Sequence, residues 1–137
     1  MSKEELKVFM PKLRNRIISE FPDFNEPKIT DRGECIELSL NKEYTFNIPF
    51  RIRDNELKVE VKFNKKYKDF IAEYWDKEKF AKEYPVRCQI VESYAKIYIV
   101  SPAYIDSHIK WDEYIEKTIE NIHILCEISD EIIEYLS

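Results

Sequence analysis

The last 31 residues of the chain, from Ser107 to Ser137, constrain the fold more than any other stretch. Apolar residues recur there at three- and four-residue spacing, and no glycine or proline interrupts them. This spacing predicts one long amphipathic helix. Its main apolar stripe consists of Ile115, Ile119, Ile122, Leu125, Cys126, Ile132, Ile133 and Leu136.

The same stretch carries most of the acidity of the chain. It holds eight acidic residues and two lysines, a net charge of −6, whereas the whole chain has a net charge of −5. The remaining residues are therefore close to neutral. We expect the helix to present an acidic surface that includes Glu113, Glu116, Glu120, Glu127, Glu131 and Glu134.

The helix is also apolar over more than one face. A helix that lies on one sheet needs a single apolar stripe about 100° wide. A second row here must be covered either by another helix of the chain or by a partner. The second explanation predicts a homodimer or a bound protein partner. The row consists of Tyr114, Ile124, Ile128 and Tyr135.

The rest of the chain alternates between helical and strand patterns. Residues 3–20 have apolar side chains on one helical face, although Pro11 predicts that the helix begins or kinks there. Strict alternation then predicts three antiparallel strands with one packed and one wet face. These strands cover residues 36–40, 44–53 and 57–63, joined at Asn41-Lys42 and Asp54-Asn55.

A helical pattern returns over residues 64–84 and ends at Pro85. A second hairpin is predicted from strands at 86–91 and 95–100. We therefore predict a single α+β domain spanning residues 1–137, in the order α-β-β-β-α-β-β-α. It contains an antiparallel sheet of about five strands, a meander plus a hairpin, flanked by helices. The aromatic content of 14% supports a packed core despite 36% charged residues.

The strand at 95–100 is apolar on both faces, so we expect core to cover one side and core or a partner the other. The candidate partner-binding residues are therefore the second row of the last helix and four residues of this strand. Those four are Ile97, Tyr98, Ile99 and Val100.

No stretch approaches the ~20 apolar residues of a membrane span, and the first residues lack the apolar core of a signal peptide. We expect a cytoplasmic protein without a membrane partner. Cys35, Cys88 and Cys126 are widely spaced and predict buried thiols, and His108 and His123 do not complete a zinc motif. With one glycine, the chain also lacks glycine-rich phosphate loops, so we predict no metal or cofactor.

A basic group on the wet face of the central hairpin raises the alternative of nucleic-acid binding, with Tyr67 or Trp75 stacking on bases. Glu56 and Glu60 lie among these basic side chains, and the net negative charge of the whole chain opposes binding to a polyanion. Cross-strand charge pairing on a solvated face explains the pattern better. The basic residues are Arg51, Arg53, Lys58 and Lys62.

An enzymatic alternative comes from Glu60-Val61-Lys62, an E-x-K sequence with Asp54 as the nearby aspartate. The element order resembles the core of the PD-(D/E)xK nucleases, where an aspartate and an E-x-K hold a divalent metal. Two carboxylates suit magnesium, and a lysine can stabilise developing negative charge. Lysine and glutamate on any polar strand face also produce E-x-K by accident, so we predict a non-enzyme.

Two stretches carry a further resemblance. GECIELSLNKEYTFNI is similar to the opening hairpin of the type III secretion chaperone and YbjN-like fold. YIVSPAYIDSHIKWDEYIEKTIENI is similar to its last strand and closing helix. The resemblance implies a homodimer that holds an extended segment of a protein partner without chemistry or cofactor. A remaining alternative is an immunity or phage anti-defence protein whose acidic helix mimics phosphate charge and blocks a nucleic-acid enzyme.

Overall fold

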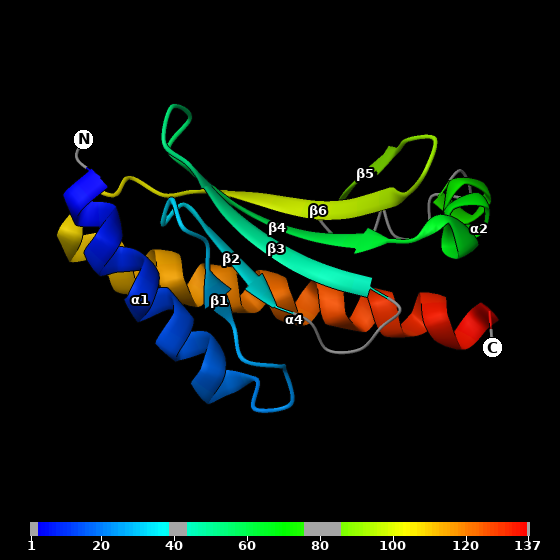
Figure 1. The fold of residues 1–137 in the computed structure, drawn as a ribbon, viewed down its shortest axis with the longest axis horizontal. Helices are drawn as coiled ribbons and strands as arrows, with labels where there is room; N and C mark the ends of the chain where they lie inside the picture. The colour runs from blue at the N-terminus through cyan, green and yellow to red at the C-terminus, as the bar shows by residue number, and fades with distance from the viewer. Residues whose placement is uncertain (1–2, 39–43, 76–85, 137) are drawn as a thin grey trace.

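The computed structural model describes residues 3–38, 44–75 and 86–136 of the chain. It is an α+β fold in which helices cover one face of a single antiparallel sheet (Figure 1). The helical elements are α1 (Lys3–Glu20), α2 (Lys65–Trp75), the 3₁₀ turn η1 (His108–Lys110) and α4 (Trp111–Leu136). The strands are β1 (Lys28–Ile29), β2 (Cys35–Leu38), β3 (Tyr44–Arg51), β4 (Glu56–Phe63), β5 (Arg87–Ile90) and β6 (Ala95–Pro102).

The predicted fold class and element order are confirmed, with six strands instead of five. The additional strand β1 has two residues, Lys28 and Ile29, which pair with Glu37 and Ile36 of β2. The sheet order is β1-β2-β3-β4-β6-β5, so β6 lies next to β4 and β5 forms one edge. The hairpin of β5 and β6 therefore extends the meander, with β6 paired to β4 and β5 at the edge of the sheet.

The boundaries differ from the sequence prediction at the turns. β3 ends at Arg51, and residues 52–55 form the turn to β4, so Ile52 and Arg53 are not strand residues. The last helix begins at Trp111 after a 3₁₀ turn, not at Ser107. The predicted link Asn41-Lys42 and the predicted helix over residues 76–84 lie outside the described residues.

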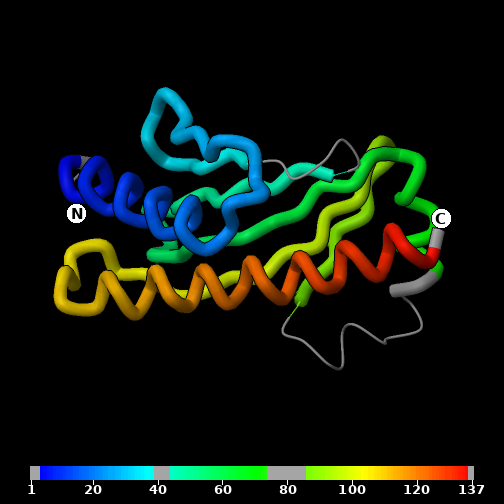
Figure 2. Tube along the Cα trace, turned by 90° about the horizontal axis from the view of Figure 1, so that it is seen from below, coloured from blue at the N-terminus to red at the C-terminus, as the bar shows by residue number. Residues whose placement is uncertain are grey.

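Helix α1 runs through Pro11 without a break, so the prediction that the helix begins at this proline is wrong. The first and last helices lie side by side beneath the sheet and run in the same general direction (Figure 2). Both helices therefore place their apolar faces against one side of the sheet.

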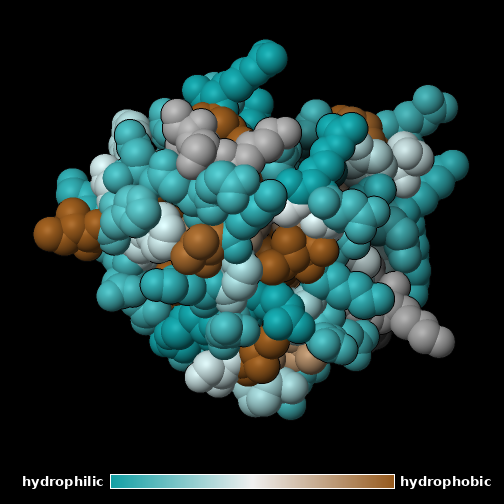
Figure 3. All heavy atoms as spheres, turned by 60° about the vertical axis from the view of Figure 1, so that its left-hand side comes forward, coloured by the Kyte–Doolittle hydropathy of each residue, from teal (hydrophilic) through white to brown (hydrophobic). Residues whose placement is uncertain are grey.

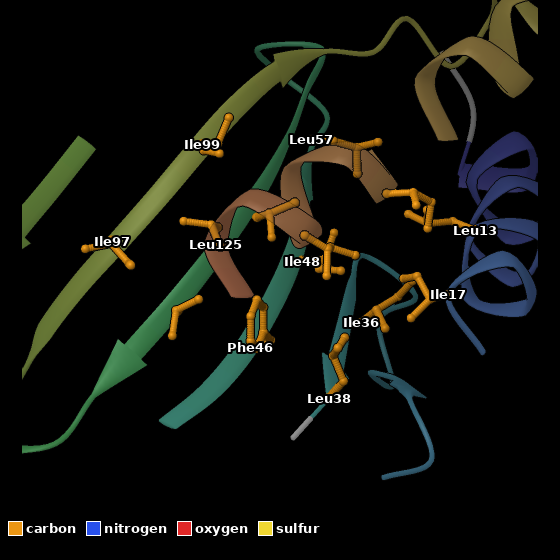
Figure 4. Close-up of a cluster of buried hydrophobic side chains, with 14 of the residues drawn as sticks. Leu13, Ile17, Ile36, Leu38, Phe46, Ile48, Leu57, Ile97, Ile99 and Leu125 are labelled. Carbon is orange, nitrogen blue, oxygen red and sulfur yellow. The ribbon is translucent and has the colours of Figure 1, made fainter. Parts of the chain in front are cut away.

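The core lies between this helical layer and the sheet. Figure 4 shows side chains from α1, α4 and four strands pointing toward one another. The buried apolar residues of β3 and β4 occupy every second position, because the side chains of a strand point to opposite faces in turn. The core-facing residues of these two strands are Tyr44, Phe46, Ile48, Phe50, Leu57, Val59, Val61 and Phe63.

Candidate binding surface

The sheet face that points away from α1 and α4 is the most distinctive surface of the molecule. We call the part of it on β3, β4, β5 and β6 the open face. Apart from Glu60, its side chains on β3, β4, β5 and β6 are exposed or half-buried. The strand register places them in cross-strand rows, such as Asn47, Glu60, Tyr98 and Arg87. The open face consists of Thr45, Asn47, Pro49, Arg51, Glu56, Lys58, Glu60, Lys62, Arg87, Gln89, Lys96, Tyr98, Val100 and Pro102.

The centre of the open face is an ordered group of charges around Glu60. The Glu60 side chain is only 10% exposed, and its Oε2 lies 3.2 Å from Lys58 Nζ and 3.5 Å from Lys96 Nζ. Lys58 Nζ also lies 4.4 Å from the centre of the Tyr98 ring. Two ammonium groups thus share one carboxylate, and an aromatic ring supports one of them.

A neighbouring contact extends this arrangement along the sheet. Lys62 Nζ lies 4.3 Å from the centre of the Tyr94 ring, and Lys96 Nζ lies 5.5 Å from the same ring. Tyr94 belongs to the four-residue turn between β5 and β6, which is closed by the Val91 amide donating to the Tyr94 carbonyl oxygen at 3.0 Å. The turn therefore places an aromatic ring beside lysines of two adjacent strands.

A cavity of about 640 Å³ opens on this face near the turn between β3 and β4. In this turn Asn55 adopts a positive φ of 52°, which asparagine tolerates better than most residues. The Asn55 carbonyl oxygen accepts a hydrogen bond of 2.7 Å from the Ala103 amide. This bond holds the segment after β6 against the turn. The cavity is lined by Arg51, Asp54, Asn55, Glu56, Lys58, Arg87, Tyr98, Val100, Pro102 and Tyr104.

The predicted partner-binding strand divides between two environments. Ile97 and Ile99 are buried at 0% and 2% exposure, because they point into the core between β6 and α4. Their prediction as partner contacts is wrong for this fold. Tyr98 and Val100 lie on the open face and line the cavity. β6 is therefore apolar on both faces because one face packs in the core and the other is part of the candidate surface.

The second row of α4 is mostly covered inside the chain. Ile128 is 1% exposed and belongs to the core, so its prediction as a contact residue is also wrong. Tyr114 and Ile124 are half-buried against the same core. Tyr135 is 69% exposed, and its ring centre lies 5.2 Å from that of Phe70 in α2. The surplus apolar surface behind the homodimer prediction is therefore small.

The six predicted acidic surface residues are all exposed on α4, as are Asp112 and Asp130. Lys117 is the single basic residue of this helix against eight acids. The open face carries five basic and two acidic side chains, an excess of +3. Because α4 covers the other side of the sheet, the molecule has an acidic helical side and a basic sheet side.

The apolar side chains of the surface are dispersed. The face in Figure 3 is mostly hydrophilic, with apolar side chains in separate islands. Among the side chains that the structure describes, the most exposed large apolar one is that of Ile109, at 94%. Scattered apolar residues of this kind are normal on a protein surface.

The nucleic-acid and nuclease alternatives find little support in the placement of their residues. Tyr67 is 3% exposed and packs against Phe63, so it cannot stack on a base, and the Trp75 side chain lies outside the described residues. Asp54 forms an ion pair of 3.4 Å with Arg51 in the turn. Glu60 lies at least about 13 Å farther along β4, at ~3.3 Å per residue. The structure therefore does not bring the two carboxylates together.

The cysteines and histidines do not form a reactive group. Burial raises the pKa of the Cys126 thiol to about 12 and that of Cys35 to about 11. Each histidine pairs with a glutamate of α1: His123 Nε2 lies 3.1 Å from Glu20 Oε2, and His108 pairs with Glu5. Within residues 3–38, 44–75 and 86–136, no three His, Cys, Asp or Glu side chains are grouped to hold a metal.

Sequence reasoning missed several members of the candidate surface. Arg87, Lys96, Tyr94 and Tyr104 were not singled out, because their proximity to Lys58 and Lys62 depends on β6 lying beside β4. A usable signal was the alternation of Lys96 and Tyr98 with the buried residues of β6. Arg53 lies in the turn and does not line the cavity.

None of the described helices is long and apolar enough to cross a membrane. We also compared the chain with protein-family models, curated proteins and solved structures. These three comparisons found no match.

Proposed function

We propose that this protein is a non-catalytic binding module that holds a protein partner on the open face of its sheet. The observation that carries the proposal is the cavity of about 640 Å³ on a sheet face whose charge is opposite to that of the protein as a whole. Its volume falls in the range of about 300–1,000 Å³ that is typical of binding clefts. Tyr98 and Val100 provide apolar contact area, and the surrounding charges orient the partner.

The surface has features that reduce the cost of binding. Lys58 and Lys96 are 17% and 22% exposed and are already held by Glu60. Side chains that are ordered before binding lose less entropy when a partner arrives. The antiparallel pairing of β4 and β6 over eight residue pairs provides a rigid base for them. The open face is thus better suited to binding than the dispersed apolar residues elsewhere.

Site-specific photo-crosslinking in living cells tests this proposal. A benzophenone amino acid is placed at Tyr98 on the open face or, as a matched aromatic control, at Tyr135 on α4. We expect crosslinks to one or a few proteins from position 98 and none from position 135. Crosslinks from position 135 alone would move the binding surface to α4. Products that contain only nucleic acid at position 98 would contradict a protein-binding function.

A second candidate function is inhibition of a nucleic-acid enzyme by the acidic helix. The observation in its favour is the length of α4, 26 residues, with eight exposed carboxylates. A row of negative charge on a rigid helix can imitate the charge of a phosphate backbone. An electrostatic inhibitor of this kind should lose association rate steeply as ionic strength rises.

Inhibition assays on a panel of purified nucleases separate the two candidates. The second candidate predicts that Glu127→Gln combined with Glu134→Gln weakens inhibition, whereas Arg87→Glu on the open face does not. If no nuclease of the panel is inhibited, or if the two sets of substitutions have equal effects, the mimicry hypothesis is contradicted.

A further inference from the structure

The cavity on the open face is lined by three basic side chains that belong to three different strands. Arg51 is in β3, Lys58 in β4 and Arg87 in β5. Within the described part of the chain, Arg87 has no hydrogen bond or ion pair, and its residue is exposed. Arginine binds a carboxylate through two parallel hydrogen bonds when its guanidinium is available. Arg87 is therefore the clearest anion-binding group of this surface.

Lys58 belongs to β4, which lies between the strands of the two arginines, and its ammonium group has two neighbours. Its ammonium group contacts Glu60 at 3.2 Å and the Tyr98 ring at 4.4 Å. Because Lys96 approaches the same Glu60 oxygen at 3.5 Å, one carboxylate faces two ammonium groups. A net positive charge remains beside the cavity. An additional carboxylate from a partner would neutralise it.

We propose that the open face binds a carboxylate-rich, extended segment of a protein, in which Arg87 and Lys58 bind the carboxylates and apolar side chains lie on Val100 and Pro102. This inference rests on the proposed function and specifies the chemistry of its partner. Charge complementarity supports it, because the open face carries an excess of +3 in a chain of net charge −5. Lys58 and Val100 are cross-strand neighbours, so an extended segment that turns both acidic and apolar side chains toward the open face can contact a cation and an apolar side chain next to each other.

A nucleic acid fits this surface less well than an acidic peptide. Asp54 and Glu56 also line the cavity and would repel a continuous phosphate backbone. Tyr98 and Tyr94 already have lysine ammonium groups over their rings, at 4.4 and 4.3 Å, so stacking on bases would have to displace these groups. Mixed charges instead suit a protein segment, in which acidic groups are separated by uncharged residues.

Fluorescence anisotropy with defined probes tests the inference on the full-length protein. The probes are a peptide in which pairs of glutamates alternate with pairs of valines, so that each face of the extended chain carries both, the same peptide with glutamine in place of glutamate, and an oligothymidylate with the charge of the first peptide. We expect the glutamate peptide to bind at least about tenfold more tightly than the glutamine peptide, since each carboxylate pairs with a cation. We also expect binding to weaken as salt is added.

Two arginine substitutions with the same charge change provide the matched comparison. We expect Arg87→Glu to weaken binding of the glutamate peptide by about tenfold or more, because it places a negative charge in the cavity. Arg53→Glu changes the net charge equally but lies outside the cavity, so its effect should stay below about threefold. Equal effects of both substitutions would overturn the inference, and so would equal binding of the glutamine peptide. Tighter binding of oligothymidylate than of the glutamate peptide would overturn it as well.

The crosslinking experiment separates failure of this inference from failure of the proposed function. It makes no assumption about the charge of the partner. Proteins crosslinked at position 98 through segments poor in Asp and Glu would overturn the inference and leave the proposed function intact. Absence of protein crosslinks at that position would overturn both.

Discussion

Arg16 of α1 and Glu116 of α4 form a bidentate ion pair that joins the first and the last helix of the chain. Arg16 Nε donates to Glu116 Oε2 at 2.9 Å, and Arg16 Nη2 donates to Glu116 Oε1 at 3.0 Å. A third hydrogen bond of 2.9 Å runs from Arg16 Nη1 to Glu20 Oε1. The guanidinium geometry matches a carboxylate in this arrangement. The pair therefore links α1 to α4 at the surface of the molecule.

We expect Arg16→Met to lower the urea midpoint of unfolding, because it removes all three hydrogen bonds while keeping a long apolar side chain. The matched control is Lys7→Met on the same helix. Lys7 Nζ lies 3.4 Å from Glu4 Oε1, and this ion pair is exposed and lies within one turn of the helix. Exposed pairs of that kind contribute little to stability. Circular dichroism in a urea series measures both midpoints. Equal shifts for the two variants would contradict a special contribution of Arg16.

The second prediction concerns the pH dependence of Glu20. Hydrogen bonds from Arg16 and from His123 lower the pKa of Glu20 below its ordinary value of 4.5. Because this pKa is lower in the folded state than in the unfolded chain, the ionised carboxylate stabilises the fold at pH values above the pKa of the unfolded chain. This contribution is lost as the pH falls through the folded value.

We therefore expect Glu20→Gln to lower the urea midpoint at pH 7 and the difference from wild type to shrink as the pH falls from about 5 to 3. The Glu20 side chain is 32% exposed, so solvent screening keeps the effect small. The measurement is a series of urea titrations across this pH interval. A difference that stays constant down to pH 3 would show that the ionised carboxylate does not contribute in this way.

The sheet and the last helix were predictable because their sequence patterns follow directly from one-sided burial. Every second residue of β3 and β4 is a buried apolar residue, since helices cover only one face of the sheet. β1 could not be predicted, because two residues are too few to show alternation. Pro11 is tolerated inside α1 on the exposed side of the helix, where water can bind the carbonyl group left without a partner.

The candidate surface was harder to predict because it depends on which strands are neighbours. Tyr98 and Val100 were identified from the apolar pattern of β6. Their proximity to Lys58 follows from the pairing of Lys58 with Val100 and of Glu60 with Tyr98. The helical pattern likewise showed that Ile128 was apolar without showing that it faces the core.

The buried position of Ile128 leads to the third prediction. Ile128 is 1% exposed, so an asparagine at this position would bury an amide without its hydration. The substitution would also remove the packing contacts of the isoleucine side chain. We expect Ile128→Asn to cost about 4 kcal/mol, a large part of the stability of a domain this size. Tyr135→Asn, at an exposed position of the same helix, should cost about 1 kcal/mol or less. Thermal unfolding distinguishes them, and equal melting temperatures of the two variants would contradict the placement of Ile128 in the core.

The fourth prediction comes from polar side chains buried in α4. Ser129 is 0% exposed, and its hydroxyl has no hydrogen-bond partner among the described residues. Both polar atoms of the Asn121 side chain are in the same situation. A buried hydroxyl that lacks a partner costs about 1 kcal/mol or more.

We therefore expect Ser129→Ala to raise the free energy of unfolding by about 1 kcal/mol, through loss of the unpaired hydroxyl and the higher helix propensity of alanine. Ser19→Ala at an exposed position of α1 is the matched control and should gain at most about 0.5 kcal/mol, from propensity alone. Urea titrations at pH 7 measure both values. A decrease in stability for Ser129→Ala would show that the hydroxyl makes a favourable hydrogen bond in solution, for example to a buried water molecule.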